Sequence, residues 1–213
     1  MSTKRNNQAK KKLLIALLIV LAALVLLICS SLIIDAIEKN RAGDTDIDYD
    51  FYPADFEADI FQNAEYLELM SSEFLNYKDA GVTLGIERED ADKYGDDLEF
   101  IVEMIYDIIY ADVDGYNACF SDTYYKKHSP KEAFTMQMVY DIHIERISTE
   151  KVTEGETQNY TKSIFAVEYK IYQNNGTFRR DIGDGSKKQY ITITDQSGAW
   201  LIDLVSTVNQ NIK

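Results

Sequence analysis

One uninterrupted apolar run near the amino terminus constrains this chain more than any other feature. From Leu13 to Ile34, 22 residues follow one another without a charged side chain. A helix rises about 1.5 Å per residue, and about 20 apolar residues are needed to cross the hydrocarbon layer of a bilayer. The run therefore predicts a transmembrane helix, and the lipid bilayer is the expected partner of this segment.

The residues at the end of the run argue against removal of this helix. A secretory signal has an apolar core of roughly 7 to 15 residues and then a small-residue cleavage site, whereas Ile33 and Ile34 lead directly into Asp35. A lipoprotein signal needs a small residue before the acylated cysteine, but Ile28 precedes Cys29. We interpret the run as an uncleaved anchor and Cys29 as a small apolar residue within it.

Charges on the two sides of the run predict its orientation in a cell membrane. Basic residues stay on the cytoplasmic side. The tail of residues 1–12 carries five Lys and Arg residues and no acid, whereas residues 35–52 are rich in Asp. We therefore expect a single-pass protein with a cytoplasmic amino terminus, an acidic linker over residues 35–52, and one extracytoplasmic domain over residues 53–213.

The extracytoplasmic part is strongly acidic. The formal charge of −14 for the chain becomes −19 for residues 35–213 once the five basic residues of the tail are left out. This charge argues against binding of nucleic acid and against close contact with anionic lipid headgroups, because both depend on clustered Lys and Arg. These 179 residues suffice for one core, and no disulfide can form within them because Cys119 is their only cysteine.

The motifs that could carry a metal or a nucleophile are incomplete. Alternating aspartates resemble the start of a calcium loop: Asp44, Asp46, Asp48 and Asp50. However, Tyr49 replaces the Gly that such a loop needs for its sharp turn, and Asp55 replaces the closing Glu. His128 and His143 show no metal-ligand spacing. We expect no metal and no cofactor, and we interpret Cys119 as a half-buried helix residue rather than as a catalytic thiol.

Apolar spacing predicts helices in the first part of the domain. A first helix before Gly81 is predicted from Phe56, Ile60, Ala64, Leu67 and Phe74. A longer helix, capped by Asp96 with Glu99, has one apolar stripe. The stripe consists of Leu98, Ile101, Val102, Ile105, Ile108 and Ile109. A short third helix is predicted at "SPKE", with Ser129 as its cap and Pro130 in the first helical position.

Alternation of apolar and polar residues predicts an antiparallel sheet in the second part. One strand places Met138, Tyr140, Ile142 and Ile144 on the same face. A second strand places Ser163, Phe165, Val167, Tyr169 and Ile171 on one face. It ends at Asn175 and Gly176, a typical hairpin turn after which a partner strand is expected from Thr177. Two further strands, "KQYITIT" and "AWLIDLVS", are separated by a turn at "DQSG".

This order of elements predicts an α+β fold in which the long helix covers the concave face of a curved antiparallel sheet. From Pro53 to Ser206 the chain resembles the NTF2-like superfamily, on this order and on the segments "DVDGYNACFSDTYYKKH" and "KKQYITITDQSGAWLIDLVS". With a single amino-terminal anchor, the layout is also similar to the bitopic assembly subunits of type IV secretion and conjugation systems. The resemblance implies a cone-shaped cavity between helix and sheet.

The resemblance leaves more than one function open. Members similar to ketosteroid isomerase use buried Asp and Tyr side chains, so Tyr106, Asp107 and Tyr110 are the candidate catalytic residues. Asp107 lies off the apolar stripe, and we expect it to be solvated. We therefore expect a protein-interaction or assembly module without catalytic activity, which binds a protein partner outside the membrane. A cavity that binds a small molecule, or an enzyme that uses Asp and Tyr there, is the alternative.

Overall fold

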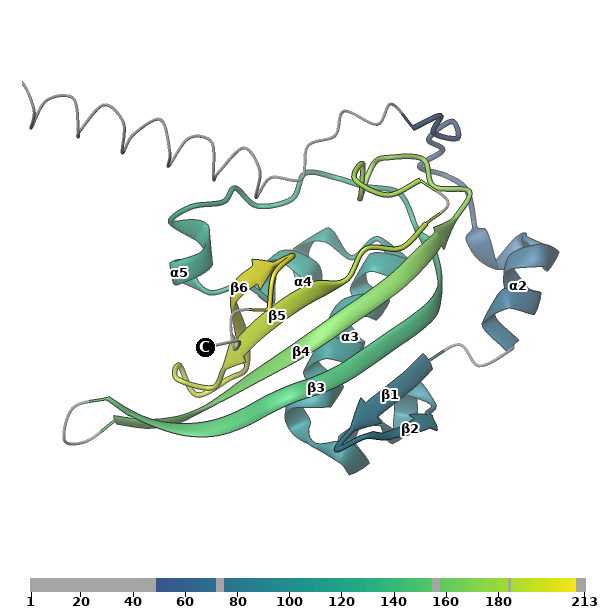
Figure 1. Ribbon diagram of the computed structural model, residues 1–213. Helices are drawn as coiled ribbons and strands as arrows, with labels where there is room; N and C mark the ends of the chain where they lie inside the picture. Colours follow the sequence, from purple (N-terminus) through teal and green to yellow (C-terminus); the bar gives the residue numbers. More distant parts are fainter. Residues whose placement is uncertain (1–48, 72–74, 155–157, 184, 210–213) are drawn as a thin grey trace, which may run out of the picture. The chain divides into compact units, whose positions relative to one another are not determined.

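The computed structural model describes residues 49–71, 75–154, 158–183 and 185–209, which form a mixed α+β domain (Figure 1). The predicted membrane span from Leu13 to Ile34 lies outside the described residues, as does most of the predicted acidic linker, including Asp44, Asp46 and Asp48. Among the residues that are described, no helix has both the length and the hydropathy needed to cross a membrane.

The elements follow one another in two groups. The first group begins with the 3-10 helix η1 (Ile60–Gln62), the helix α2 (Ala64–Ser71), and the strands β1 (Leu75–Asp79) and β2 (Val82–Gly85). It continues with η2 (Arg88–Tyr94), the long helix α3 (Asp96–Tyr110), and the short helices α4 (Val113–Ala118) and α5 (Asp122–Tyr125). The second group consists of β3 (Met138–Glu154), β4 (Gln158–Tyr172), β5 (Gln189–Thr194) and β6 (Leu201–Ser206).

All six strands belong to one sheet with the order β2-β1-β3-β4-β5-β6. Neighbouring strands are antiparallel except for β1 and β3, which run parallel with Leu75 opposite Ile142. Figure 1 shows β3 and β4 as the longest strands of the sheet, with α3 across the face behind them. The predicted meander of antiparallel strands is confirmed for β3 to β6. The β1–β2 hairpin extends the same sheet beyond β3.

The apolar stripe of α3 forms the centre of the core, as predicted. Its six residues are at most 1% exposed: Leu98, Ile101, Val102, Ile105, Ile108 and Ile109. They belong to one cluster with inward-facing residues of the sheet, among them Ile144, Phe165 and Val167. The helix cap lies one residue earlier than predicted, at Gly95 rather than Asp96. Asp96 instead stands in the first turn, where a negative charge is favourable.

A bulge in β3 changes which of its residues face the core. The register between β3 and β4 shifts between Tyr140 and His143, and Asp141 has a positive φ of 51°. Because one extra residue is inserted there, Val139 and Ile142 are both buried, although the regular alternation predicted opposite faces for them. The predicted common face for Tyr140 and Ile142 is therefore wrong. The corresponding prediction for β4 is confirmed, since Ser163, Phe165, Val167, Tyr169 and Ile171 are all buried.

The predicted first helix is divided into several elements. The helical part is limited to η1 and α2, where Tyr66 is fully buried while Phe56 and Leu67, both assigned to the apolar face, are exposed. The chain then forms the β1–β2 hairpin, which the sequence analysis missed. Its two-residue turn consists of Ala80 and Gly81, with φ values of 47° and 83°. Positive φ at both positions is the geometry of a type I′ turn, which matches the twist of two strands.

Two other predicted elements are replaced by loops because side-chain amides bind the backbone. The helix expected at Ser129 is absent from the described chain: the Asn117 side chain accepts a hydrogen bond from Lys131 N at 2.8 Å and donates one to Lys131 O at 3.0 Å. The strand expected from Thr177 is a loop as well. There the Asn174 side chain donates to the carbonyl groups of Arg179 and Ile182, and β4 pairs next with β5.

We expect Ile105→Ala to lower the free energy of unfolding by about 2 to 5 kcal/mol, because the change removes buried methyl and methylene groups and leaves a cavity between α3 and the sheet. Glu99→Ala serves as a control on an exposed position of the same helix and should cost no more than about 1 kcal/mol. Denaturant unfolding of both variants measures the difference. Equal, small losses would contradict this description of the core.

Candidate functional site

Of the three candidate catalytic residues of α3, Tyr106 and Tyr110 lie side by side, with ring centres 6.1 Å apart, but Asp107 lies apart from them. The ring of Tyr106 lies 4.2 Å from the guanidinium of Arg88, whereas Tyr110 is 49% exposed and packs beside Phe61. Asp107 points toward the end of α4. None of these three residues lines any of the four pockets found among the described residues. The geometry of a shared acid–base site between Asp and Tyr is therefore not present among the described residues.

Asp107 is half-buried, so the expectation of a fully solvated carboxylate is wrong. The turn after α3 folds α4 over this side of the helix, and the Cys119 Sγ lies 3.8 Å from Asp107 Oδ2. Burial, followed by the negative charge of Asp112, raises the pKa of Asp107 to about 6. Burial, followed by the charge of Asp107, raises the pKa of Cys119 to about 12. The thiol therefore stays protonated at neutral pH, whereas a nucleophilic cysteine needs a lowered pKa.

The two histidines lie far apart in the fold and have ordinary partners. His143 is exposed on β3, with Nε2 2.8 Å from Asp141 Oδ1. His128 follows α5 and stacks on Tyr124 with ring centres 4.1 Å apart. In the part of the chain that is described, no group of three or more His, Cys, Asp and Glu residues is placed to hold a metal ion. Asp50, the one described member of the alternating aspartates, is exposed.

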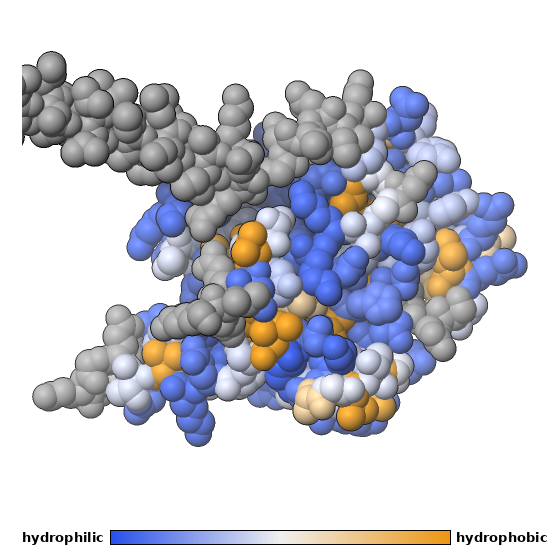
Figure 2. Space-filling model, viewed as in Figure 1, coloured by the Kyte–Doolittle hydropathy of each residue, from blue (hydrophilic) through white to orange (hydrophobic). Residues whose placement is uncertain are grey.

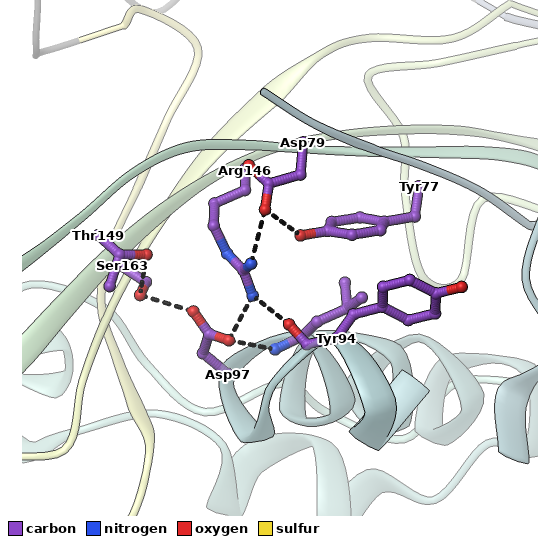
Figure 3. A network of polar contacts seen from close by, with 8 residues as sticks. Tyr77, Asp79, Tyr94, Asp97, Arg146, Thr149 and Ser163 are labelled. Atoms are coloured by element: carbon purple, nitrogen blue, oxygen red, sulfur yellow. Dashed lines mark hydrogen bonds and ion pairs between the residues drawn. The ribbon is translucent and has the colours of Figure 1, made fainter. Parts of the chain in front are cut away.

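Arg146 of β3 is the centre of a polar network at the start of α3 (Figure 3). Its guanidinium donates to Asp79 Oδ2 at 2.9 Å, to Asp97 Oδ1 at 2.6 Å and to the carbonyl oxygen of Tyr94 at 2.9 Å. The second oxygen of Asp97 accepts a hydrogen bond from Ser163 Oγ at 2.7 Å. The network thus joins β1, the end of η2, the first turn of α3 and strands β3 and β4.

The contacts of this network indicate a structural role. The side chains of Arg146 and Asp97 are only 16% and 9% exposed, and each charge already has an opposite charge beside it. The pocket next to them is an open depression lined mainly by the same polar residues. Removing one partner from a buried ion pair typically costs 3–5 kcal/mol, because the other charge is left without compensation. We therefore interpret the network as a tie between helix and sheet rather than as a ligand site.

Polar side chains cover the face of the molecule seen in Figure 2, with hydrophobic residues in separate small areas. On the outer face of the sheet, charges pair across neighbouring strands, Lys78 with Glu145 and Lys170 with Asp141, and Lys188, just before β5, pairs with Glu168 of β4. These residues line a pocket of about 370 Å³. Because its charges compensate one another, the pocket offers no net attraction for an ion of either sign.

A groove lined by aromatic rings lies between α4, α5 and the segment that follows them. It has a volume of about 500 Å³, and its walls include Tyr116, Phe120, Tyr124, Tyr125 and His128. The rings of Phe120 and Tyr124 are 4.4 Å apart. The Tyr125 hydroxyl donates to the carbonyl oxygen of Asn117 at 2.6 Å. The ring faces are therefore held in place while Tyr124 and His128 stay accessible to solvent.

A second hollow of about 390 Å³ continues from the first, since both are lined by Tyr116, Lys131 and Thr177. Its walls add Arg179 and Arg180, so we call this hollow the basic pocket and the first one the aromatic groove. The two arginines are not equivalent. Arg179 is buried and forms two hydrogen bonds with Asp181, at 2.7 and 2.8 Å. Arg180 is exposed and lies over the ring of Phe51.

The basic pocket holds more positive than negative charge. Burial favours the neutral form of Asp181, but the hydrogen bonds and charges of Arg179 and Lys187 outweigh it and lower the pKa of this carboxyl to about 2. Burial and the nearby charge of Arg179 lower the pKa of Lys131. The Lys131 ammonium donates to the carbonyl oxygen of Phe178, and no carboxylate among the described residues forms an ion pair with Lys131 or Arg180.

Aromatic residues near the start of the domain support the loop that carries the basic pocket. Phe51 packs against Gly176, where a Cβ would lie 2.9 Å from the ring. Tyr49 lies against Gly183 in the same way, and Tyr52 N donates to the carbonyl oxygen of Asn174 at 3.0 Å. The last residues of the predicted linker, from Tyr49 to Tyr52, therefore contact the domain. The loop over residues 174–183 is held by these rings and by its own Asn174.

Neither the aromatic groove nor the basic pocket is predicted by the sequence pattern. The residues Tyr116, Tyr124 and Tyr125 carry only the resemblance to a superfamily. The pair Arg179 and Arg180 was the available signal, because two adjacent arginines are unusual in a part of the chain with a formal charge of −19. Together, the aromatic groove and the basic pocket can bind a ligand that combines an apolar side chain with negative charge.

No family model, no curated protein and no solved structure matches this chain. The resemblance to the NTF2-like superfamily thus stays a prediction from the order of elements. Function has to be argued from the residues themselves.

We expect Asp107→Asn to change stability in a pH-dependent way. A carboxyl with a raised pKa in the folded state binds its proton more tightly than in the unfolded state, so folding loses stability as pH rises from about 4 to 6. Because Asn cannot ionise, the variant does not undergo this loss of stability. At pH 7 it should be more stable than the wild type by no more than about 1 kcal/mol, because solvent screens this half-exposed group, and at pH 3.5 the two should be equal.

Thermal unfolding across this pH range measures the effect. Asp114→Asn makes the same change in charge at an exposed position of α4 and serves as the control. A stability difference between Asp107→Asn and the wild type that is the same at pH 3.5 and pH 7 would contradict the raised pKa.

Proposed function

We propose that this chain is a single-pass membrane protein whose carboxyl-terminal NTF2-like domain binds a protein partner outside the cytoplasm. The membrane part of the proposal rests on the uncharged run from Leu13 to Ile34 and on the five basic residues before it. The NTF2-like part is supported by the long helix α3 on a curved six-stranded sheet (Figure 1).

The proposed binding role rests on the surface formed by the aromatic groove and the basic pocket, which is open to solvent. Aromatic side chains supply large contact areas at low entropic cost and are enriched at protein interfaces. The rings of Tyr124 and His128 are stacked with centres 4.1 Å apart, and His128 is exposed while Tyr124 is half-buried. A domain that needed these rings only for its own core would bury them.

The interior of the domain supports binding rather than catalysis. The stripe of α3 and the inward residues of β3 to β6 are buried in one cluster. The titratable residues Tyr106, Asp107 and Tyr110 lie on the other sides of the helix and do not share a pocket among those described. An acid–base enzyme needs such groups within hydrogen-bonding reach of one substrate.

Photo-crosslinking in living cells tests this function. A crosslinking amino acid in place of Tyr124 should give a specific adduct with a partner protein, and protease added outside intact protoplasts should digest both the adduct and residues 35–213. A crosslinker in place of His143, on the outer face of the sheet, is the matched control for surface exposure.

The outcomes separate the two parts of the proposal. Protection of residues 35–213 from the protease would overturn the extracytoplasmic location. Absence of any protein adduct at both positions would overturn the interaction role. An adduct at His143 alone would keep the interaction role and move it to the sheet.

A further inference from the structure

The basic pocket stands out because its charge is opposite to that of the domain as a whole. Residues 35–213 carry a formal charge of −19, and most cations on the sheet have a carboxylate of their own within 4 Å. At the basic pocket, one carboxylate is shared by two cations: Asp181 Oδ2 lies 2.7 Å from Arg179 Nη2 and 3.3 Å from Lys187 Nζ. Lys131 and Arg180 lack such a partner among the described residues. The local excess of positive charge is therefore available to a ligand.

We propose that the aromatic groove and the basic pocket together bind an extended acidic peptide of the partner protein. This inference rests on the proposed interaction role and specifies the chemistry of the partner. An apolar or aromatic side chain of the peptide packs on the stacked rings of Tyr124 and His128. Carboxylates that follow it along the peptide reach Lys131 and Arg180, where they meet charge-assisted donors.

The length of the two connected hollows favours a peptide over a small anion. The walls run from Tyr125 and His128, past Tyr116 and Lys131, to Arg180. Inorganic phosphate would use only the basic end of this surface. The aromatic groove contains one carboxylate in its wall, Glu132, so the negative groups of the peptide are expected at the other end.

The charge of the whole domain favours a peptide over a polyanion. Nucleic acid and anionic membranes present many closely spaced negative charges and attract proteins through extended basic surfaces. A formal charge of −19 repels such polymers. A short acidic segment needs only the few contacts inside the pocket. At physiological salt, the negative charges of the domain that lie more than about 8 Å from the pocket are largely screened and repel this segment little.

The ring packing explains how the surface keeps its shape before a ligand arrives. Tyr116 lies edge-on to Phe134 and Phe178, with ring centres 6.0 and 5.2 Å apart. Phe178 in turn lies under the ammonium of Lys131 at 4.9 Å. The backbone of Lys131 is fixed by both hydrogen bonds to Asn117. Binding to a preformed surface costs less conformational entropy than binding to an unordered one.

Selection from a phage-displayed library of random twelve-residue peptides on the full-length chain in detergent tests this inference. We expect enriched peptides that combine at least two acidic residues with an aromatic or other apolar residue. A synthetic copy of an enriched peptide, labelled with fluorescein, should bind about tenfold more weakly to Arg180→Glu and to Tyr124→Ala, the loss expected for one close charge pair or one ring contact.

Lys151→Glu is the matched control, because it makes the same reversal of charge at an exposed position of β3 without changing the pocket. It should leave the affinity within about twofold of the wild type. Circular dichroism of each variant checks that the fold is kept. Lys131→Gln provides a second probe of the pocket that removes one charge without reversing it.

Several results would overturn the inference. Enrichment of basic or uncharged peptides, enrichment of none, or equal affinity of Arg180→Glu would each do so. Binding of inorganic phosphate alone would reduce the pocket to a simple anion site, and binding of vesicles with anionic phospholipid would assign it to a membrane surface. A crosslinked partner at His143 with no peptide binding would refute this inference while the proposed interaction role stands.

Discussion

The fold depends on the contact between the apolar face of α3 and the inward face of the sheet. Six fully or almost fully buried aliphatic residues of the helix meet inward-facing residues of β3 to β6. The hydrophobic effect that drives this contact is not directional, so by itself it specifies the position of the helix less sharply than a hydrogen bond does. The hydrogen bonds of Arg146 define this position, because Asp97 in the first turn of α3 must meet both Arg146 and Ser163.

With α3 in place, the segment after it is confined to one end of the sheet. Ala111 ends the helix in a left-handed conformation, with φ of 57°, and turns the chain into α4. Ser121 N and Cys119 O bond with the backbone of Ile202, which ties this segment to β6. Gln137 N donates to Ile109 O where the chain returns to start β3. The aromatic groove is built on α4, α5 and the loop after α5, which lie between these fixed points, and the basic pocket adds the loop after β4.

The sequence predicts those elements whose pattern depends on burial of one face. The stripe of α3 and the predicted inward face of β4 follow from this rule, and both are buried, although Ile164 and Ala166 on the other face of β4 are buried as well. The errors occur where a local polar contact replaces the expected pattern. The bulge at Asp141 shifts the alternation of β3, Asn117 prevents the helix at Ser129, and Asn174 holds a loop in place of the hairpin. The hydrogen bonds of a side-chain amide do not recur at a regular interval along the chain, so the spacing of apolar and polar residues does not reveal which backbone group the amide will bind.

The site was less predictable than the fold for a related reason. The aromatic groove combines residues of α4 and α5 with the segment around Lys131, and the basic pocket adds residues from the loop after β4. These residues come together only through the tertiary structure, and their types are ordinary. Of the candidates chosen from the sequence, Tyr106 and Tyr110 are four residues apart and lie on one side of α3, with ring centres 6.1 Å apart. Asp107 points to another side of the helix, toward Cys119, so the carboxylate does not join the two tyrosines.

Complementation of a strain that lacks this protein tests most directly whether the domain works by binding at its surface. Each variant should first be shown to reach the wild-type level in cells. We expect Arg180→Glu and Tyr124→Ala to abolish function and Asp107→Asn and Lys151→Glu to retain it. Loss of function in Asp107→Asn, with full function in Arg180→Glu and Tyr124→Ala, would contradict binding at this surface and place the activity in chemistry beside α3.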